Sequence, residues 1–416
     1  MAEPVPFKIA VSDEQLEWIN QRVRTARIPP GKDAPEEQIW QEQGLPASYA
    51  RHLQDYWANS YDWRRIETQL NAELEQFTLP ISHADEEHTI HFVHHRAKKP
   101  SAIPLLFIHG WPGSFLEVRK IIALLTDPEG DDQQAYHVVA PSLPGFGFSS
   151  YPRKHVCPPW EISSILTKLM HALSYNRFVV QGGDWGSMIG RLIATDSPAS
   201  VLGLHLNFII GTPPSPIWHP LAVAKLARAY LFKGAGLTAY EKTMFERMQW
   251  WNAAEAGYQK IQGTKPQTLN YGLVDSPLGM LCWLREKVQF IVDREAGFEW
   301  DDEEVVTWCM PYILNGTAGH SEIYMCIPKE GSSKPEDKML LTRLFDKIIS
   351  RTVPVGVSVF PKDVAFVPKW WAESKVAENI AFWKEREKGG HFPSVERPKD
   401  LVEDVRAFTV AANIKL

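Results

Sequence analysis

The chain has 416 residues, of which 44% are hydrophobic, and it carries a formal net charge of −6. This length and apolar content suffice for one large domain with an insertion and a well-buried core. The mild negative charge, without a basic stripe, argues against a nucleic-acid partner. The four cysteines show no CxxC spacing, which favours a reducing compartment and predicts neither a disulfide framework nor a metal site.

The sequence shows neither the pattern of a membrane span nor that of a secretory signal. No apolar stretch approaches the roughly twenty residues that span a bilayer. Residues 1–9 also lack the basic-then-apolar order of a secretory signal. We therefore expect a cytoplasmic protein without a membrane anchor.

Residues 1–99 form a first segment in which helical periodicity dominates. Apolar side chains recur at helical intervals around residues 13–25 and 46–77, as in amphipathic helices. The segment ends with a strand pattern over residues 89–95. We expect it to pack against the main domain and against a cap on that domain.

The rest of the chain divides into two core parts and an insertion. Strand and helix patterns alternate over residues 100–212, which predicts a mainly parallel sheet. Residues 213–334 are helical, rich in aromatic residues and broken by turns, as an inserted cap would be. The alternation resumes over residues 335–416. The expected strands are residues 105–109, 137–142, 178–181 and 201–208. The expected helices lie near residues 116–125, 160–173, 187–195 and 398–411. The second core part begins with elements at residues 340–349 and 353–360.

A turn with the sequence HGWPGS follows the buried-strand pattern of residues 104–108. After a strand in this position, such a turn can present a backbone amide to developing negative charge. We assign that amide to Trp111. A plain Gly/Pro turn is the alternative interpretation.

The sequence GGDWGS directly follows the strand pattern of residues 178–181. Small residues around one central side chain are typical of a nucleophile elbow, a strained turn that exposes that side chain above the sheet. Here the central residue is Asp184, and a carboxylate is already anionic at neutral pH. It therefore favours displacement at an sp³ carbon, with an alkyl ester on the enzyme, over acyl transfer. An acidic helix N-cap is the alternative interpretation, and Trp185 would supply the second amide of an oxyanion hole.

Two further residues complete a pattern in chain order. Asp363 follows the strand-like residues 353–360, and His391 lies in a GGHF turn near the C-terminus. Nucleophile, acid and histidine is the order of the α/β-hydrolase triad. Each residue alone has a structural explanation as a turn residue or a buried histidine, whereas their order favours the triad.

These motifs resemble those of epoxide hydrolases of the microsomal type, in a soluble, fungal-like form. The N-terminal sequences PFKI, DEQL and YDWR are similar to the segment that precedes the catalytic domain in that family. HGWPGS, PSLPGFGFS, GGDWGS, FPKD and GGHF extend the resemblance over most of the chain. It implies an α/β-hydrolase fold with a helical cap inserted in the core domain and an N-terminal helical extension. It also implies a homodimer through the cap and no metal or organic cofactor.

The family places two tyrosines in its cap. Tyr258 matches the first position, and we assign Tyr324 to the second. The family often has a basic residue shortly before the second tyrosine, whereas this chain has Ser, Glu and Ile there, so Tyr312 is the alternative.

The resemblance implies that a small apolar epoxide is hydrolysed to a vicinal diol. Asp184 would form the ester, the two tyrosines would protonate the epoxide oxygen, and His391 with Asp363 would activate water. A haloalkane dehalogenase shares the aspartate and is the main alternative. A serine-type esterase, and a non-catalytic ligand-binding protein on the same fold, are the others.

Overall fold

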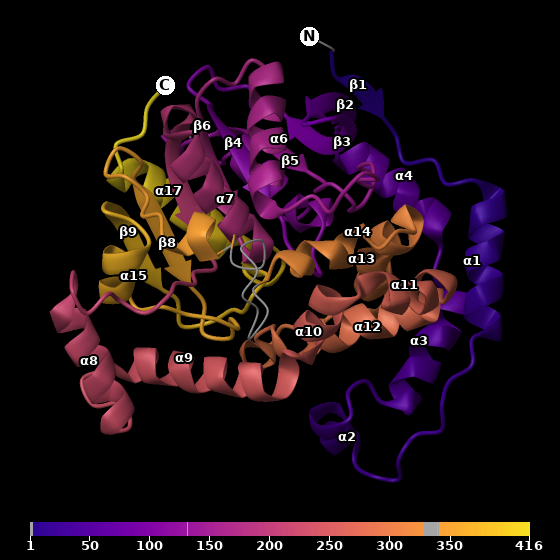
Figure 1. The fold of residues 1–416 in the computed structure, drawn as a ribbon. Helices are drawn as coiled ribbons and strands as arrows, with labels where there is room; N and C mark the ends of the chain where they lie inside the picture. Colours follow the sequence, from indigo (N-terminus) through magenta and orange to yellow (C-terminus); the bar gives the residue numbers. More distant parts are fainter. Residues whose placement is uncertain (1–2, 131, 328–338, 340) are drawn as a thin grey trace.

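A computed structural model describes residues 3–130, 132–327, 339 and 341–416, and these residues are built around one sheet of nine strands (Figure 1). The strand order is β1-β2-β3-β5-β4-β6-β7-β8-β9. The strands are β1 (Val5–Phe7), β2 (Gln76–His83), β3 (Glu86–His95), β4 (Ile103–Ile108), β5 (Tyr136–Pro141), β6 (Phe178–Gly182), β7 (Val201–Leu206), β8 (Val355–Val359) and β9 (Ile380–Glu385).

The sheet changes from antiparallel to parallel at β5. Strands β1, β2, β3 and β5 pair antiparallel, whereas β5, β4, β6, β7, β8 and β9 pair parallel. Strands β4, β6, β7 and β8 are buried along their whole length, as expected of a parallel sheet covered on both faces. Their carboxyl ends therefore meet at one edge, where the sequence motifs are located.

Helices cover both faces of the sheet. Helices α6 and α7 pack together on one face, and α5 and α17 pack together on the other. The core helices are α5 (Ile122–Thr126), α6 (Pro159–Ala172), α7 (Asp184–Asp196), α15 (Lys369–Lys375), α16 (Pro393–Glu396) and α17 (Pro398–Ala411), with the 3₁₀ turns η1 (Phe115–Val118) and η2 (Pro198–Ser200) and the π-helical turn η7 (Leu341–Phe345).

A second, helical layer lies against the edge formed by the carboxyl ends of the parallel strands (Figure 1). It consists of α8 (Pro220–Leu231), α9 (Ala239–Trp250), the π-helical turn η3 (Trp251–Glu255), α10 (Gly257–Thr264), α11 (Pro266–Asp275), α12 (Pro277–Phe290), η4 (Arg294–Ala296), α13 (Asp302–Asn315), α14 (Gly319–Glu322) and η5 (Ile323–Cys326). We call these elements the cap. The boundary expected at residues 334 and 335 lies outside the described residues.

The N-terminal helices pack along the outer side of the cap. They are α1 (Asp13–Thr25), α2 (Glu36–Glu42), α3 (Ala47–Asn59) and α4 (Trp63–Glu73), and α1 and α3 pack against α12 while α3 also contacts α13. Polar contacts join the two layers, including the Tyr61 hydroxyl with Thr307 at 3.1 Å and an ion pair between Arg22 and Asp275. The N-terminal segment thus braces the cap, as the sequence predicted.

Two of the expected elements differ in the structure. The helix expected near residues 116–125 is instead the turn η1 followed by the short helix α5. The helical region expected over residues 46–77 is broken at Asp62, whose side chain accepts a hydrogen bond from the amide of Arg65 and starts α4. It ends before Gln76, because alternating apolar residues there pair with β3 and form β2. In the element expected at 340–349, residue 340 lies outside the described residues.

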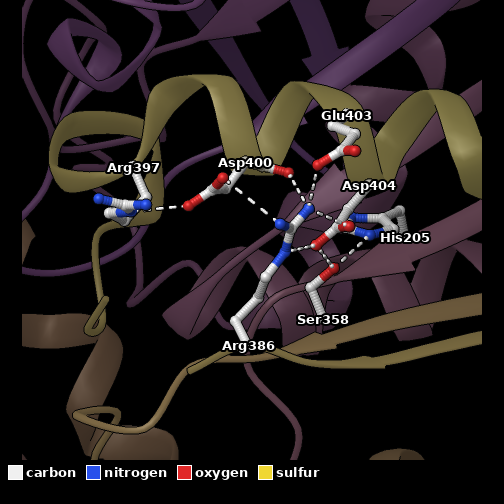
Figure 2. A network of polar contacts seen from close by, with 7 residues as sticks. All are labelled: His205, Ser358, Arg386, Arg397, Asp400, Glu403 and Asp404. Atoms are coloured by element: carbon white, nitrogen blue, oxygen red, sulfur yellow. Dashed lines mark hydrogen bonds and ion pairs between the residues drawn. The ribbon is translucent and has the colours of Figure 1, made fainter. Parts of the chain in front are cut away.

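An ionic network fixes α17 against β7 and β8 (Figure 2). The guanidinium of Arg386, just after β9, donates to both carboxylate oxygens of Asp404, at 3.0 and 2.6 Å. Asp404 also accepts a hydrogen bond of 2.7 Å from the Ser358 hydroxyl of β8, which lies 3.1 Å from His205 of β7. Since charged groups this deep are stable only when paired, the network ties the last strands to α17 and fixes the loops that follow them.

Candidate active site

Asp184 stands at the end of β6 with its backbone in the left-handed region, at φ +46°. Such a conformation is strained for a residue other than glycine, and in enzymes it often holds a reacting side chain. One carboxylate oxygen, Oδ1, accepts a hydrogen bond of 2.7 Å from the backbone amide of Trp111. Trp185 follows in the first turn of α7, where backbone N–H groups have no helical acceptor. The structure therefore brings Asp184 and both predicted oxyanion-hole residues together.

His391 and Asp363 lie beside this carboxylate. Nδ1 of His391 is 2.6 Å from Oδ1 of Asp363, and Nε2 is 3.3 Å from Oδ2 of Asp184. The amide of Val364 also donates to Asp363, at 2.6 Å. A base held by one carboxylate on one nitrogen and facing a second on the other is the arrangement expected of the triad.

The electrostatic environment of His391 is set by these two carboxylates. Burial of the imidazole opposes its protonation, but the negative charges and hydrogen bonds of Asp363 and Asp184 outweigh that effect and raise the pKa of His391 well above its usual range. With both carboxylates ionised, the imidazole therefore holds a proton between them. Its pKa must fall when Asp184 loses its charge.

The cap holds the backbone of both triad loops. Arg247 of α9 donates to the carbonyl oxygens of Asp363, at 2.9 Å, and Lys362, at 2.6 Å. The amide of His391 donates to the carbonyl oxygen of Ile291, at the end of α12, at 2.7 Å. Neither contact has a local sequence signal, because each joins residues about a hundred positions apart in the chain. The acid and the base thus owe their positions partly to the cap.

Two cap tyrosines, Tyr258 of α10 and Tyr324 of η5, point into the site. The ring of Tyr258 stacks on the Trp111 indole with centroids 4.8 Å apart, and its edge faces Tyr324 at 5.6 Å. Tyr324 also meets the Trp185 indole edge to face at 5.1 Å. Its hydroxyl is buried and forms no hydrogen bond to the described residues. Burial and the negative charge of Asp184 raise the pKa of both phenols, so both keep their protons at neutral pH.

The alternative tyrosine, Tyr312, occupies a different position. Its hydroxyl donates a 2.5 Å hydrogen bond to the carbonyl oxygen of Gly113. The phenol therefore braces the HGWPGS turn from the cap side. Its proton is already engaged by a backbone acceptor, which leaves Tyr324 as the tyrosine with an unengaged hydroxyl.

The Trp111 side chain is fixed from behind by a buried polar chain that sequence reasoning missed. Its indole N–H donates to Nδ1 of His320 at 3.2 Å, and Nε2 of His320 is 3.0 Å from the Asn270 side-chain oxygen. Burial lowers the pKa of His320 to about 3, so the imidazole stays neutral. A neutral ring with its proton on Nε2 satisfies both contacts.

Glu117, on η1, is a second residue that the sequence did not single out. Its side chain is 6% exposed, and its Oε1 has no hydrogen-bond partner among the described residues. Burial raises the pKa of Glu117 to about 8, while the positive charge of His391 acts in the opposite direction. A buried acid within the electrostatic reach of both Asp184 and His391 belongs to the site.

Metal-binding clusters and membrane-spanning helices are both absent from the described residues. Within them, no cluster of at least three His, Cys, Asp or Glu side chains is arranged to hold a metal ion. In that same part of the chain, no helix combines the length and apolar character needed to cross a membrane.

The strained elbow at the carboxyl edge of a parallel sheet defines an α/β-hydrolase, and the family model described as alpha/beta hydrolase fold matches residues 103–241. The model described as epoxide hydrolase N terminus matches residues 4–118. Epoxide hydrolase 1 of Sus scrofa is 33% identical, in an alignment covering 97% of this chain and 88% of that protein. The juvenile hormone epoxide hydrolase of Manduca sexta is 30% identical, covering 97% of this chain and 85% of that protein. The chain belongs to the epoxide hydrolase family.

Solved structures agree with this assignment. Aspergillus niger epoxide hydrolase superposes with a TM-score of 0.81 and 28% identity, covering 99% of this chain and 97% of that chain. Juvenile hormone epoxide hydrolase from Bombyx mori gives a TM-score of 0.86 and 27% identity, covering 99% and 95%. The predicted fold class and resemblance are therefore confirmed, and the protein is a hydrolase that acts on epoxides.

Proposed function

We propose that the protein hydrolyses a small apolar epoxide to a vicinal diol through a covalent ester on Asp184. The observation that carries this proposal is the position of the two carboxylate oxygens. Oδ1 is held by the Trp111 amide at 2.7 Å, whereas Oδ2 faces the interior of the site, near His391. One oxygen is thus anchored in the oxyanion hole and the other is left to attack carbon.

In the first half-reaction, Oδ2 of Asp184 displaces the ring oxygen from one epoxide carbon. A bond forms between Oδ2 and that carbon, the carbon–oxygen bond of the ring breaks, and a phenol proton from Tyr258 or Tyr324 passes to the departing alkoxide. Positioned general acids of this kind contribute roughly 10²–10⁴-fold. The products of the step are a hydroxyalkyl ester and a tyrosinate.

In the second half-reaction, water attacks the ester carbonyl carbon while His391 takes its proton. Negative charge develops on the ester oxygen that the Trp111 amide holds, and the Trp185 amide is the second donor that we propose for it. When the tetrahedral intermediate collapses, the bond to the diol oxygen breaks and the protonated His391 supplies the proton that this oxygen needs. The proton released as Asp184 returns to its carboxylate form restores the tyrosine, so the cycle consumes only water and epoxide.

The surroundings favour an apolar epoxide over a haloalkane. Four aromatic side chains, Trp111, Trp185, Tyr258 and Tyr324, pack against one another beside the nucleophile, and aromatic surroundings suit an apolar ligand. A dehalogenase would need N–H donors to hold halide. The indole N–H of Trp111 already donates to His320, whereas two protonated phenols suit an oxygen leaving group.

The test is a single turnover in ¹⁸O-water with enzyme in excess over an aryl epoxide such as styrene oxide. The diol from the first turnover should carry almost no label, because its new oxygen comes from Asp184, and the label should appear in the active-site peptide. Asp184→Asn, as the control, should give neither diol nor label. A first-turnover diol that carries the solvent label would mean direct attack of water and would overturn the covalent route.

A further inference from the structure

Glu117 is a buried carboxyl to which the mechanism above gives no task. It follows Phe115 and Leu116 and precedes Val118, which are all buried apolar residues. Its Oε1 has no hydrogen-bond partner in the part of the chain that the structure describes. Leaving a buried polar oxygen unpaired costs free energy, so a structural role alone does not explain a carboxyl here.

The position of this oxygen is defined by the two loops around it. A Cβ atom added to Gly113 would lie 1.9 Å from Oε1 of Glu117 and 3.1 Å from the ring of Phe392, the residue after His391. The absence of a side chain at residue 113 therefore lets the Glu117 carboxyl reach into the space between the HGWPGS turn and the histidine loop. The Gly110 amide, one residue before Trp111, also faces this carboxyl.

A second buried side-chain oxygen lies close to the Glu117 carboxyl. Oγ of Ser394, on α16, is buried without a partner among the described residues and is within interaction range of Glu117. Helix α16 packs against η1, which carries Glu117. The Glu117 carboxyl and the Ser394 hydroxyl interact with each other, and the carboxyl lies in the electrostatic range of His391. Together with the imidazole they offer polar contacts of the kind by which a protein orders a water molecule.

We propose that Glu117 holds the water that hydrolyses the Asp184 ester, with Oε1 accepting one hydrogen of that water while the other points to Nε2 of His391. This inference rests on the covalent route proposed above. It assigns Glu117 to the second half-reaction only, since no water takes part in ring opening.

The step balances without any further reactant. A lone pair of the water oxygen forms the bond to the ester carbon, and the proton that faces His391 moves to Nε2. The other hydrogen keeps its bond to Oε1 as the tetrahedral intermediate forms, so Glu117 neither gains nor loses a proton. Holding the water requires only an acceptor oxygen at Oε1 of Glu117. A carboxyl that is mainly protonated still has a carbonyl oxygen that can accept this hydrogen bond.

The experiment compares Glu117→Met with Glu117→Gln by rapid mixing, following formation and decay of the alkyl-enzyme separately. Met has the length of Glu without an acceptor oxygen and suits the apolar surroundings, whereas Gln keeps a carbonyl oxygen. We expect Glu117→Met to slow ester hydrolysis by about 10- to 100-fold, the range for loss of positioning, with alkylation unchanged. The Gln variant should recover part of that loss. Glu67→Met, which removes a buried carboxyl from α4 at the N-terminal segment, is the matched control and should leave both rates unchanged in the folded enzyme.

His391→Gln separates failure of this inference from failure of the covalent route. If His391→Gln traps an adduct and Glu117→Met still hydrolyses its ester at the wild-type rate, Glu117 does not hold the water. If no adduct forms in His391→Gln, the covalent route itself fails. Should Glu117→Met not fold, a crystal structure of the trapped His391→Gln adduct decides: a water bonded to Oε1 of Glu117 supports the assignment, and a carboxyl with no water overturns it.

Discussion

The ring of Tyr258 stacks on the indole of Trp111, with centroids 4.8 Å apart and planes inclined by 17°. Trp111 also donates its backbone amide to Asp184. One core residue therefore sets both the oxyanion hole and the height of a cap phenol above the nucleophile. A movement of the cap at Tyr258 should therefore also displace the Trp111 amide that donates to the Asp184 carboxylate.

Replacing His391 by Gln should separate the two half-reactions. Ring opening needs only Asp184 and the phenols, so an alkyl-enzyme heavier by the mass of the epoxide should accumulate. Hydrolysis should fall by several decades, because the base is gone. Intact-protein mass spectrometry after mixing with epoxide checks this. An inactive variant without an adduct would assign His391 to the first step or to the fold.

Tyr258 and Tyr324 should both contribute to ring opening, whereas Tyr312 should not. A hydrogen bond to a charged acceptor contributes about 1.5–3 kcal/mol, so Tyr258→Phe and Tyr324→Phe should each slow alkylation by roughly one to two decades. The double variant should abolish alkylation. Tyr312→Phe should leave alkylation nearly unchanged and lower stability, since its hydroxyl bonds Gly113. Pre-steady-state alkylation rates decide, and slowing by Tyr312→Phe with no effect of Tyr324→Phe would exchange their roles.

A methyl group at residue 110 should disturb the nucleophile directly. The Cβ of alanine there would lie 2.1 Å from Oδ1 of Asp184, so Gly110→Ala must push the carboxylate away from the Trp111 amide. We expect alkylation to slow by about 10²-fold, as for other displacements of about 1 Å. Gly272→Ala, on α11 with nothing within 4 Å of the added Cβ, is the control. It should keep full activity and gain about 0.5–1 kcal/mol of stability.

The two half-reactions should differ in their pH dependence. In the free enzyme both Asp363 and Asp184 raise the pKa of His391. Esterification neutralises Asp184, so this pKa falls in the intermediate, and hydrolysis should rise with pH through the lowered value. Alkylation should lack that rise, because it needs no base. Single-turnover rates between pH 5 and 10 check this, and parallel profiles for the two steps would contradict it.

The same pKa shift predicts how stability varies with pH. A histidine whose pKa is raised on folding stabilises the native state fully below its unfolded pKa of about 6.5, and that contribution is lost as pH rises through the folded value. The difference in unfolding free energy between wild type and His391→Gln should therefore be largest in mild acid and shrink toward alkaline pH. Chemical denaturation at several pH values measures it, and a difference that grows with pH would refute the assignment.

Local motifs predicted most of the strand-to-turn junctions, because a buried apolar run followed by glycines has few other conformations. The helices at Asp13–Thr25 and Pro398–Ala411 were predicted to the residue. The helix expected over residues 46–77 ran into the first two residues of β2, and the rest of β2 was given no element. Helix α2 and strand β9 were not predicted either, and β9 forms only by pairing with β8. Glu117 and Arg247 also went unpredicted. Each is a single charged residue without a local motif. Its role depends on loops that are distant in the chain, the His391 loop for Glu117 and the Asp363 loop for Arg247.

The contacts of Arg247 and Ile291 with the triad loops have a consequence for access to the site. The backbone of Asp363 and that of His391 are each hydrogen-bonded to the cap, while the N-terminal helices clasp its outer side. A hinged opening of the whole cap would displace Asp363 and His391 from their positions beside Asp184 at every turnover. We therefore expect substrate to enter and diol to leave by movements of individual side chains and not by a hinged opening of the whole cap, so the size of these side chains should limit which epoxides reach the triad.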